Sequence, residues 1–203
     1  MTRRQNTTER KAQIVAEVLR LADEIGPDRL STTDVARAVG VSQPAIFRHF
    51  PSRNALWLGV AEHLATHLNN AWDAVEAKTP DPYQRLRNLI AEQLTLISKT
   101  PALPSILFSR ELSVENAELR KVFGGLLASY QARLVAMIAR LQETGELNNR
   151  ITADDVAVLL TSLIQGVAIR WTLGARGFSL VQEGLRLVDV QLSTLQAPTI
   201  AAQ

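Results

Sequence analysis

Apolar residues recur at intervals of three and four along almost the whole chain, which is the period of an amphipathic α-helix. In the first such stretch, Ile14, Val18, Leu21 and Ala22 mark one face. No stretch shows the strict alternation of a half-buried strand. The pattern therefore predicts an all-α protein of about nine helices. They are expected at residues 8–25, 32–39, 43–49, 53–78, 83–98, 102–112, 115–144, 153–173 and 180–195.

The second and third helices are short, and their ends are marked by specific residues. Ser31 followed three positions later by Asp34 is the pattern of a capping box at the start of the second helix. Gly40 supplies the positive φ that a tight turn needs. Ser42 then caps a third helix, whose first turn tolerates Pro44. We expect these two helices and the first to form a small head with a helix-turn-helix.

The chain is accordingly predicted to have two parts. Residues 1–52 form the N-terminal helix-turn-helix domain, beginning with a polar arm at residues 1–8. Residues 53–203 form a C-terminal helical bundle. The break at residues 79–82, Thr-Pro-Asp-Pro, separates the long fourth helix from the rest of the bundle.

Composition narrows the class of protein. The 203 residues are 46% hydrophobic, enough for a real core, and they include no cysteine, so disulfides and thiolate metal sites are excluded. No signal peptide is recognised, and the most apolar stretch carries Gln165 and Arg170, which favours a buried helix over a membrane span. We expect a cytoplasmic protein without a membrane partner.

The distribution of charge along the chain is more informative about a binding partner than the net charge. The formal net charge is +2, but the first 56 residues hold nine Lys and Arg against six Asp and Glu. A basic head on a nearly neutral body is compatible with binding to the phosphates of a nucleic acid.

The segment from Thr32 to Leu56 carries the chemistry. Ala36 and Gly40 are spaced so that a second helix can cross the first steeply and project into the major groove of DNA. On that recognition helix Gln43 is suited to read adenine and Ala45 to touch a thymine methyl group. The basic residues that follow are expected to meet phosphates or a guanine. They are Arg48, His49 and Arg53.

This segment resembles the DNA-binding signature of the TetR family of bacterial regulators over roughly residues 10–60. The matching elements are Ser31-x-x-x-Val35-Ala36, Val39-Gly40-Val41-Ser42, Phe47-Arg48-His49-Phe50 and Arg53-x-x-Leu56. Two positions depart from the usual pattern. Phe47 stands where tyrosine is common, so a hydroxyl that would bond a phosphate is missing, and Arg53 replaces lysine with its charge kept.

The resemblance implies a set of DNA-binding positions. The residues expected to contact phosphates are Ser31, Thr32, His49 and Arg53. Those expected to lie in the groove are Ser42, Gln43, Ala45 and Arg48. Pro44 and the ring of Phe47 complete the set. It further implies a repressor that binds a palindromic operator of double-stranded DNA and leaves it when a small, hydrophobic effector binds.

The last two helices predict a homodimer. Residues 153–173 are apolar nearly all round, and residues 180–195 carry a second apolar stripe. Two such helices from each subunit can form a four-helix interface about a two-fold axis. Burial inside one subunit is the alternative, but one short recognition helix reads too few bases for useful specificity.

The resemblance also implies an effector pocket in the body. Candidate lining residues share helix faces that combine apolar and polar groups. They are His63, His67, Phe108, Phe123, Tyr130, Arg133, Met137, Gln165 and Trp171. His63 and His67 continue an apolar stripe and are expected inside the protein or at a cleft edge. Their spacing also suits a shared metal ion, but no third ligand accompanies them, so no metal or cofactor is predicted.

Two other classes of function are compared with this interpretation. No histidine follows a glutamate at the spacing of a di-metal carboxylate site, and no phosphate-binding loop or nucleophile motif is present, so an enzyme is not predicted. An architectural or cell-cycle DNA-binding protein, with the same head but no small-molecule inducer, remains open.

Overall fold

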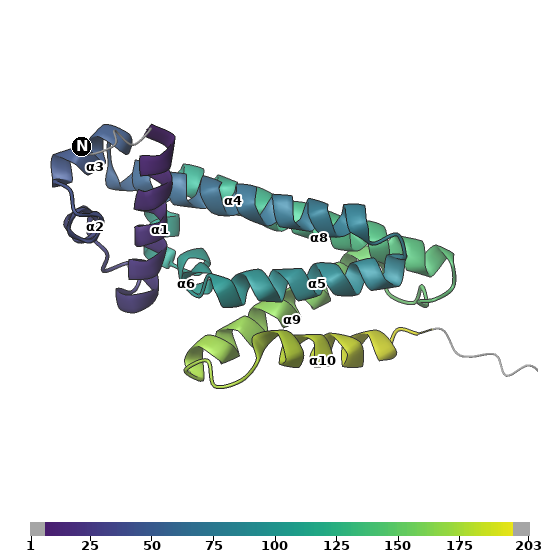
Figure 1. The fold of residues 1–203 in the computed structure, drawn as a ribbon. Coiled ribbons are helices and arrows are strands. Elements are labelled where there is room, and N and C mark those ends of the chain that lie inside the picture. The colour runs from purple at the N-terminus through teal and green to yellow at the C-terminus, as the bar shows by residue number, and fades with distance from the viewer. Residues whose placement is uncertain (1–6, 197–203) are drawn as a thin grey trace, which may run out of the picture. The chain divides into compact units, whose positions relative to one another are not determined.

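The computed structural model describes residues 7–196, and over these residues the protein is all-α, as predicted (Figure 1). Its strand content there is limited to one isolated bridge between Leu147 and Gln196. The described helices are α1 (Thr7–Ile25), α2 (Thr32–Val39), α3 (Gln43–His49), α4 (Arg53–Lys78), α5 (Pro82–Lys99), α6 (Ala102–Leu107), α7 (Arg110–Glu115), α8 (Ala117–Glu143), α9 (Ala153–Leu173) and α10 (Leu180–Ser193).

The main difference from the sequence-based expectation lies between α5 and α8. One helix was predicted at residues 102–112, whereas the structure has α6 and α7. Ser109 separates them because its backbone is extended (φ −64°, ψ 111°) and its hydroxyl accepts the amide of Leu112 at 3.0 Å. A side-chain cap thus starts a new helix where periodicity predicted continuation. Of the polar arm predicted at residues 1–8, residues 1–6 lie outside the described part, and residues 7–8 belong to α1.

The chain forms two compact packing units. The first contains residues 7–67 and 100–125 of the described chain, and the second contains residues 68–99 and 126–196. Their boundaries fall inside α4, between α5 and α6, and inside α8. The functional division at residues 52 and 53 stays a prediction, since packing units and functional parts are different divisions.

In the first unit, α1 packs against α2, α3 and α6. Its core is built from aliphatic side chains on the inner faces of these helices together with one tryptophan. Ile14 and Val18 of α1, Val35 of α2, Ile46 of α3 and Trp57 of α4 are all at most 1% exposed. The short α2 and α3 depend on this burial because helices of seven or eight residues are not stable alone in water.

In the second unit, α10 packs against α5 and α9. Gly184 allows a close approach, since a Cβ atom at this position would lie 2.6 Å from Cδ1 of Leu94. At the surface Arg87 forms a bidentate pair with Asp189, with N–O distances of 2.9 and 2.7 Å. An apolar contact and an ion pair together hold the last helix on α5.

Two described helices, α8 and α9, are long and apolar enough to span a membrane by length and composition alone. In the most apolar 18-residue segment of each helix, 33% of α8 and 44% of α9 is buried inside the protein. Core helices of soluble proteins meet the same criteria of length and composition. The feature is weak evidence for a membrane span.

Candidate DNA interface and ligand groove

The capping box at the start of α2 forms as predicted. The Ser31 hydroxyl accepts the amide of Asp34 at 3.2 Å, and the Asp34 carboxylate accepts the amide of Ser31 at the same distance. Hydrogen bonds from the Ser31 hydroxyl and then its amide hold the pKa of Asp34 below its ordinary value. The box fixes where α2 begins and therefore where Thr32 is placed.

The turn between α2 and α3 is made by Gly40. Its backbone is left-handed (φ 74°, ψ 35°), and its amide donates to the carbonyls of Ala36 and Arg37. Val41 adds a bond to the Ala36 carbonyl at 3.0 Å. Ala36 is 3% exposed, so the small residue lies where the two helices meet, as its spacing predicted. The local geometry is that of a helix-turn-helix.

The recognition helix α3 is anchored by Ile46, which is fully buried. Its outer face consists of residues predicted to approach DNA. Ser42, Pro44, Phe47 and Arg48 are exposed, and Gln43, Ala45 and His49 are half-buried. Ser42 occupies the cap position but makes no side-chain capping bond, in contrast to Ser31. The structure thus leaves the α3 face open, while DNA contact by these residues stays a prediction.

Two predicted DNA-binding residues contact each other. The Gln43 amide donates to the Thr32 hydroxyl at 2.7 Å. The bond joins the first residues of α2 and α3, so the groove-facing Gln43 is oriented by a residue that was expected to contact phosphate. Both residues remain candidates for DNA binding.

Arg53, the last predicted phosphate contact, lies in a network that the sequence interpretation did not include. Its terminal nitrogens lie 3.3 Å from a Glu115 oxygen and 3.8 Å from a Glu111 oxygen, and Nη2 also donates to the Asp28 carbonyl at 3.3 Å. The i, i+4 spacing of Glu111 and Glu115 places both carboxylates on one face of α7. The sequence shows the spacing of the two glutamates, but this spacing does not reveal that Arg53 is their partner.

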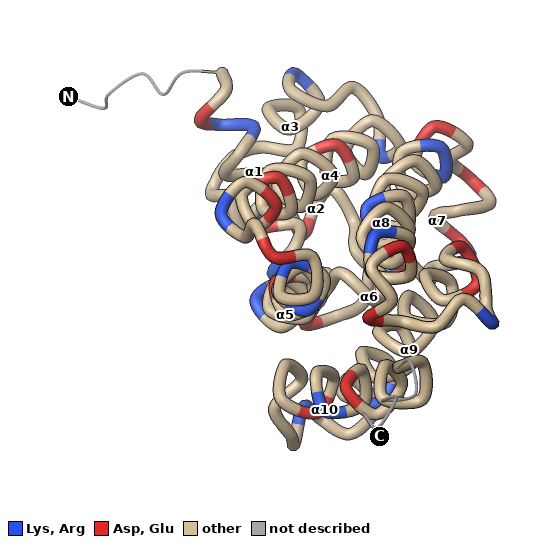
Figure 2. Tube along the Cα trace, turned by 90° about the vertical axis from the view of Figure 1, so that its right-hand side faces the viewer, with Lys and Arg blue, Asp and Glu red and all other residues tan. Residues whose placement is uncertain are grey.

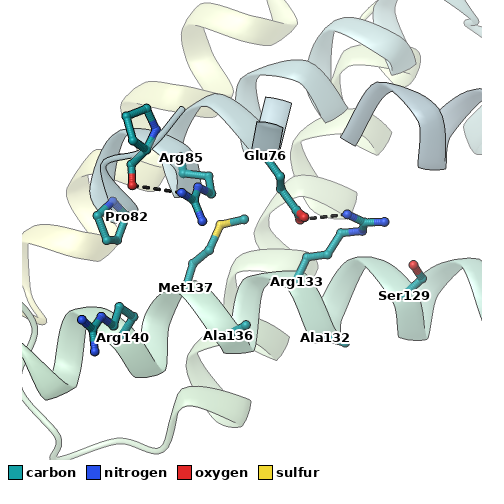
Figure 3. A pocket seen from close by; sticks show the side chains of 10 residues that line it. Glu76, Pro82, Arg85, Ser129, Ala132, Arg133, Ala136, Met137 and Arg140 are labelled. Atoms are coloured by element: carbon teal, nitrogen blue, oxygen red, sulfur yellow. Dashed lines mark hydrogen bonds and ion pairs between the residues drawn. The ribbon is translucent and has the colours of Figure 1, made fainter. Parts of the chain in front are cut away.

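A second candidate site is a groove of about 920 Å³ in the second unit, between the end of α4, the start of α5 and the middle of α8 (Figure 3). Ala132 and Ala136 line it along α8. Met137 points into the space between Arg85 and the Arg133–Glu76 pair (Figure 3). The groove therefore combines a small apolar floor with charged walls.

The arginines of the groove differ in their partners. Arg133 contacts Asp73 at 2.6 Å and Glu76 at 2.8 Å. Burial works to lower the pKa of Arg133, but the bonds to Glu76 and Asp73 outweigh it and raise the pKa above its ordinary value. Arg85 instead donates to backbone carbonyls, those of Thr79 and Pro80. Three arginines and one glutamate line the groove, so it offers a ligand more charged and polar groups than apolar surface.

The structure divides the predicted pocket residues. Arg133 and Met137 line the groove. Tyr130 and Trp171 are buried and Gln165 is half-buried in the second unit, whereas Phe123 is buried in the first. The buried Tyr130 ring packs on Trp72 with ring centroids 4.9 Å apart, and burial raises the pKa of its hydroxyl. A single pocket formed by the whole predicted set stays a prediction.

Three pocket candidates are placed differently from the expectation. His63 and His67 are exposed on α4, so they do not lie inside the protein, and their place at the edge of a pocket stays a prediction. The apolar stripe faces inward through Val60 and Leu64, and the histidines fall beside it. Phe108 is 52% exposed because it ends α6 at the break that periodicity did not predict.

The two histidines form a stacked pair with ring centroids 6.5 Å apart. Partial desolvation and then the neighbouring His67 lower the pKa of His63. Within residues 7–196 there is no cluster of three or more His, Asp or Glu residues arranged to hold a metal ion.

Charge is not concentrated on either unit. Figure 2 shows basic and acidic positions interspersed along the helices. Two of the nine basic residues counted in the head, Arg3 and Arg4, lie outside the described residues. Binding of DNA phosphates by the described head therefore depends on where its basic residues lie and not on an overall positive charge.

Comparison with protein-family models gives two matches. Residues 14–60 match the bacterial regulatory proteins of the tetR family, and residues 82–197 match the C-terminal region of BetI-type transcriptional repressors. The first match covers the helix-turn-helix, and the second covers more than half of the chain.

Curated relatives share sequence over much of their length. The nucleoid occlusion factor SlmA of Vibrio atlanticus is 29% identical over 133 residues, which is 66% of this chain and 67% of that protein. The transcriptional regulator EthR of Mycolicibacterium smegmatis is 28% identical over 153 residues, 75% of this chain and 70% of the relative.

Solved structures share the fold. A TetR transcription regulator from Haloarcula marismortui superposes with a TM-score of 0.80 at 18% identity, covering 93% of this chain and 99% of that one. A chain assigned as a transcriptional regulator from Saccharomonospora viridis, solved in complex with choline, gives a TM-score of 0.83 at 22% identity and covers 94% and 100%.

Proposed function

The chain belongs to the TetR family of DNA-binding transcriptional regulators, and from this premise we propose that it is a ligand-responsive repressor rather than an enzyme. In this proposal a homodimer binds a palindromic operator in the cytoplasm, and a small, hydrophobic effector releases it. The observation that carries the proposal is the open face of α3 in a helix-turn-helix whose α2 begins with a complete capping box.

The proposed DNA contacts are divided between the backbone and the bases. Ser31, Thr32, His49 and Arg53 contact phosphates, and Phe47, 39% exposed, lays its ring against the backbone. Gln43, Ala45 and Arg48 read base edges in the major groove beside Ser42 and Pro44.

The proposed dimer uses α9 and α10. Large apolar side chains remain exposed there beside the buried faces of both helices. They are Val158, Leu159, Ile169 and Leu173 on α9 and Val190 on α10. Ser162 and Gly166 lie between them and are small enough for close helix approach. An isologous interface over this face covers the exposed apolar surface.

A dimer places two α3 helices on successive major grooves, about 34–36 Å apart along the operator. An effector that favours a different spacing lowers operator affinity, and by linkage the operator lowers effector affinity by the same factor. The groove lined by Arg133 and Met137 supports an effector site in the second unit. The neighbour from Saccharomonospora viridis, solved in complex with choline, supports only that this fold can hold a small ligand.

A second function is favoured by the relatives. Several are nucleoid occlusion factors, including SlmA of Vibrio cholerae, which is 31% identical over 115 residues, 57% of this chain and 58% of that protein. The alternative is therefore a nucleoid-associated protein that binds many dispersed sites without an inducer. The two functions predict different numbers of genomic sites.

Selection of sheared DNA from the source genome, followed by sequencing of the retained fragments, tests the proposal. A few palindromic sites support a local repressor, many dispersed sites support the second function, and no enrichment contradicts both. Arg48→Ala is expected to weaken specific binding by about 1–3 kcal/mol if Arg48 reads a guanine. Arg20→Ala is the matched control, since Arg20 is ion-paired within α1 to Glu17 and Glu24.

A further inference from the structure

We propose that Glu111 and Glu115 of α7 compete with an operator phosphate for the guanidinium of Arg53, so that the position of α7 sets how strongly the head binds DNA. The inference rests on the proposed function, in which Arg53 contacts a phosphate. It assigns a positioning role to two carboxylates that do not themselves contact DNA.

The competition follows from how Arg53 is engaged. Nη1 lies 3.3 Å from Glu115, and Nη2 lies 3.8 Å from Glu111 and donates to the Asp28 carbonyl at 3.3 Å. Both terminal nitrogens thus have partners in the protein alone. Arg offers five N–H donors in a fixed planar fork, so a phosphate that accepts from this guanidinium either shares it with these partners or displaces one of them. In both cases the phosphate lies close to two carboxylates.

These ion pairs are loose enough to be displaced. Both exceed the distance of a short charge-assisted hydrogen bond, and the Glu111 and Glu115 side chains are 48% and 51% exposed. Exposed pairs of this kind contribute little stability, so a phosphate can replace them. The carboxylates that remain nearby then repel the phosphate, and this repulsion reduces operator affinity.

The segment that carries the carboxylates is itself attached to the head at both ends. At its start, the Ser109 hydroxyl donates to the Asp28 carboxylate at 2.5 Å. At its end, Asn116 donates to the Asn54 carbonyl at 2.9 Å, and Asn54 donates to the Glu115 carbonyl at 3.3 Å. These bonds connect α7 with the α1–α2 loop and the first turn of α4.

The result is a mechanical link between α7 and one DNA contact. A shift of α7 away from Arg53 removes two negative charges from the vicinity of the phosphate and frees the guanidinium. A shift toward Arg53 strengthens the competing pairs. In this proposal operator affinity changes through α7 without a movement of α3.

The test measures operator affinity over a series of salt concentrations for Glu111→Gln, Glu115→Gln and the double variant. Each single substitution is expected to tighten binding about two- to five-fold, the range of an exposed ion pair. The double variant is expected to steepen the slope of log K against log salt by about one, as one more phosphate contact does. Glu118→Gln, which removes the same charge from the first turn of α8, is the control.

The decisive comparison repeats these substitutions with Arg53→Gln. If the carboxylates act through Arg53, the tightening disappears in that background. Equal tightening in both backgrounds, or tightening by Glu118→Gln to the same degree, would overturn the inference in favour of a general charge effect. Weaker binding of the Glu variants would overturn it as well.

A double-mutant cycle tests the ion pair in the absence of DNA. The free energy of unfolding is measured for Arg53→Gln, for Glu115→Gln and for the variant with both substitutions. A positive coupling between the two residues is expected, and zero coupling would refute the ion pair itself. Failure of the inference is distinguishable from failure of the proposed function, because the first leaves genomic operator selection by the unmodified protein intact and the second abolishes it.

Discussion

Gly59 of α4 lies directly against the ring of Phe50, the residue that ends the recognition helix. A Cβ atom at position 59 would be 2.5 Å from Cε1 of Phe50. The ring is 6% exposed, and Lys11 lies over it with its Nζ 5.5 Å from the centroid. The end of α3 is therefore held between α1 and a glycine of α4.

Gly59→Ala is expected to lower the free energy of unfolding by about 1–3 kcal/mol, because the added methyl group overpacks the Phe50 site. Urea unfolding measures this, and operator affinity is expected to fall with it, since a displaced Phe50 reorients α3. An unchanged midpoint would show that the ring can move away without cost.

Gly124→Ala and Gly125→Ala are the matched substitutions with the opposite sign. A Cβ atom at either position meets nothing within 4 Å, and both glycines lie inside α8. Replacing glycine by alanine in an open helical position is expected to raise stability by about 1 kcal/mol each. Thermal unfolding tests this, and destabilisation by either variant would show that α8 needs glycine for a contact outside the single chain.

Asp189→Asn is expected to reduce stability by less than about 1 kcal/mol near neutral pH, since its ion pair with Arg87 is partly solvated. Hydrogen bonds from Arg87 lower the pKa of Asp189. The stabilisation is therefore fully present above the ordinary aspartate pKa of about 4 and is lost as the pH falls through the lowered value.

Unfolding of the unmodified protein and of the Asp189→Asn variant as a function of pH checks this sign. The two stability curves should run parallel at neutral pH and converge in acid. Curves that diverge in acid would contradict the assignment. In the Arg87→Gln background the effect of Asp189→Asn on stability should largely disappear.

Ile169→Glu is expected to convert a dimer into a monomer, because it places a charge in the centre of the proposed α9 interface. Sedimentation velocity measures the state, and operator binding should weaken with it. Val114→Glu makes the same chemical change at a 69% exposed site on α7 and should leave the dimer intact. Dissociation by both variants, or by neither, would argue against α9 as the interface.

Tyr130→Phe is expected to leave stability unchanged or to raise it. The Tyr130 hydroxyl is buried and has no hydrogen-bond partner within the described chain, so its removal relieves an unsatisfied polar group. Tyr83→Phe, at a half-buried site at the start of α5, is the control. A clear loss of stability on removing the Tyr130 hydroxyl would reveal a partner, such as a bound water, that satisfies it.

Much of the head follows from local sequence. Ser31 and Asp34 form their capping box, and Gly40 adopts the left-handed turn, because these features depend only on residues a few positions apart. The apolar period located most helices for the same reason. Periodicity missed the break at Ser109, where a single hydroxyl bond starts a new helix.

Tertiary structure decided which surfaces the helices present and which partners distant residues meet. The exposure of His63 and His67 depends on which face of α4 is covered by other helices. An apolar stripe with spacings of three and four residues does not determine the edge of the buried face to within one residue. The engagement of Arg53 by Glu115 joins residues 62 apart, and no local pattern records such a pair. The sequence by itself thus determined the helices, their caps and the family. Only packing between helices decided the ion pairs of Arg53, the groove beside Arg133 and the apolar face of α9, because these depend on long-range contacts rather than on local preference.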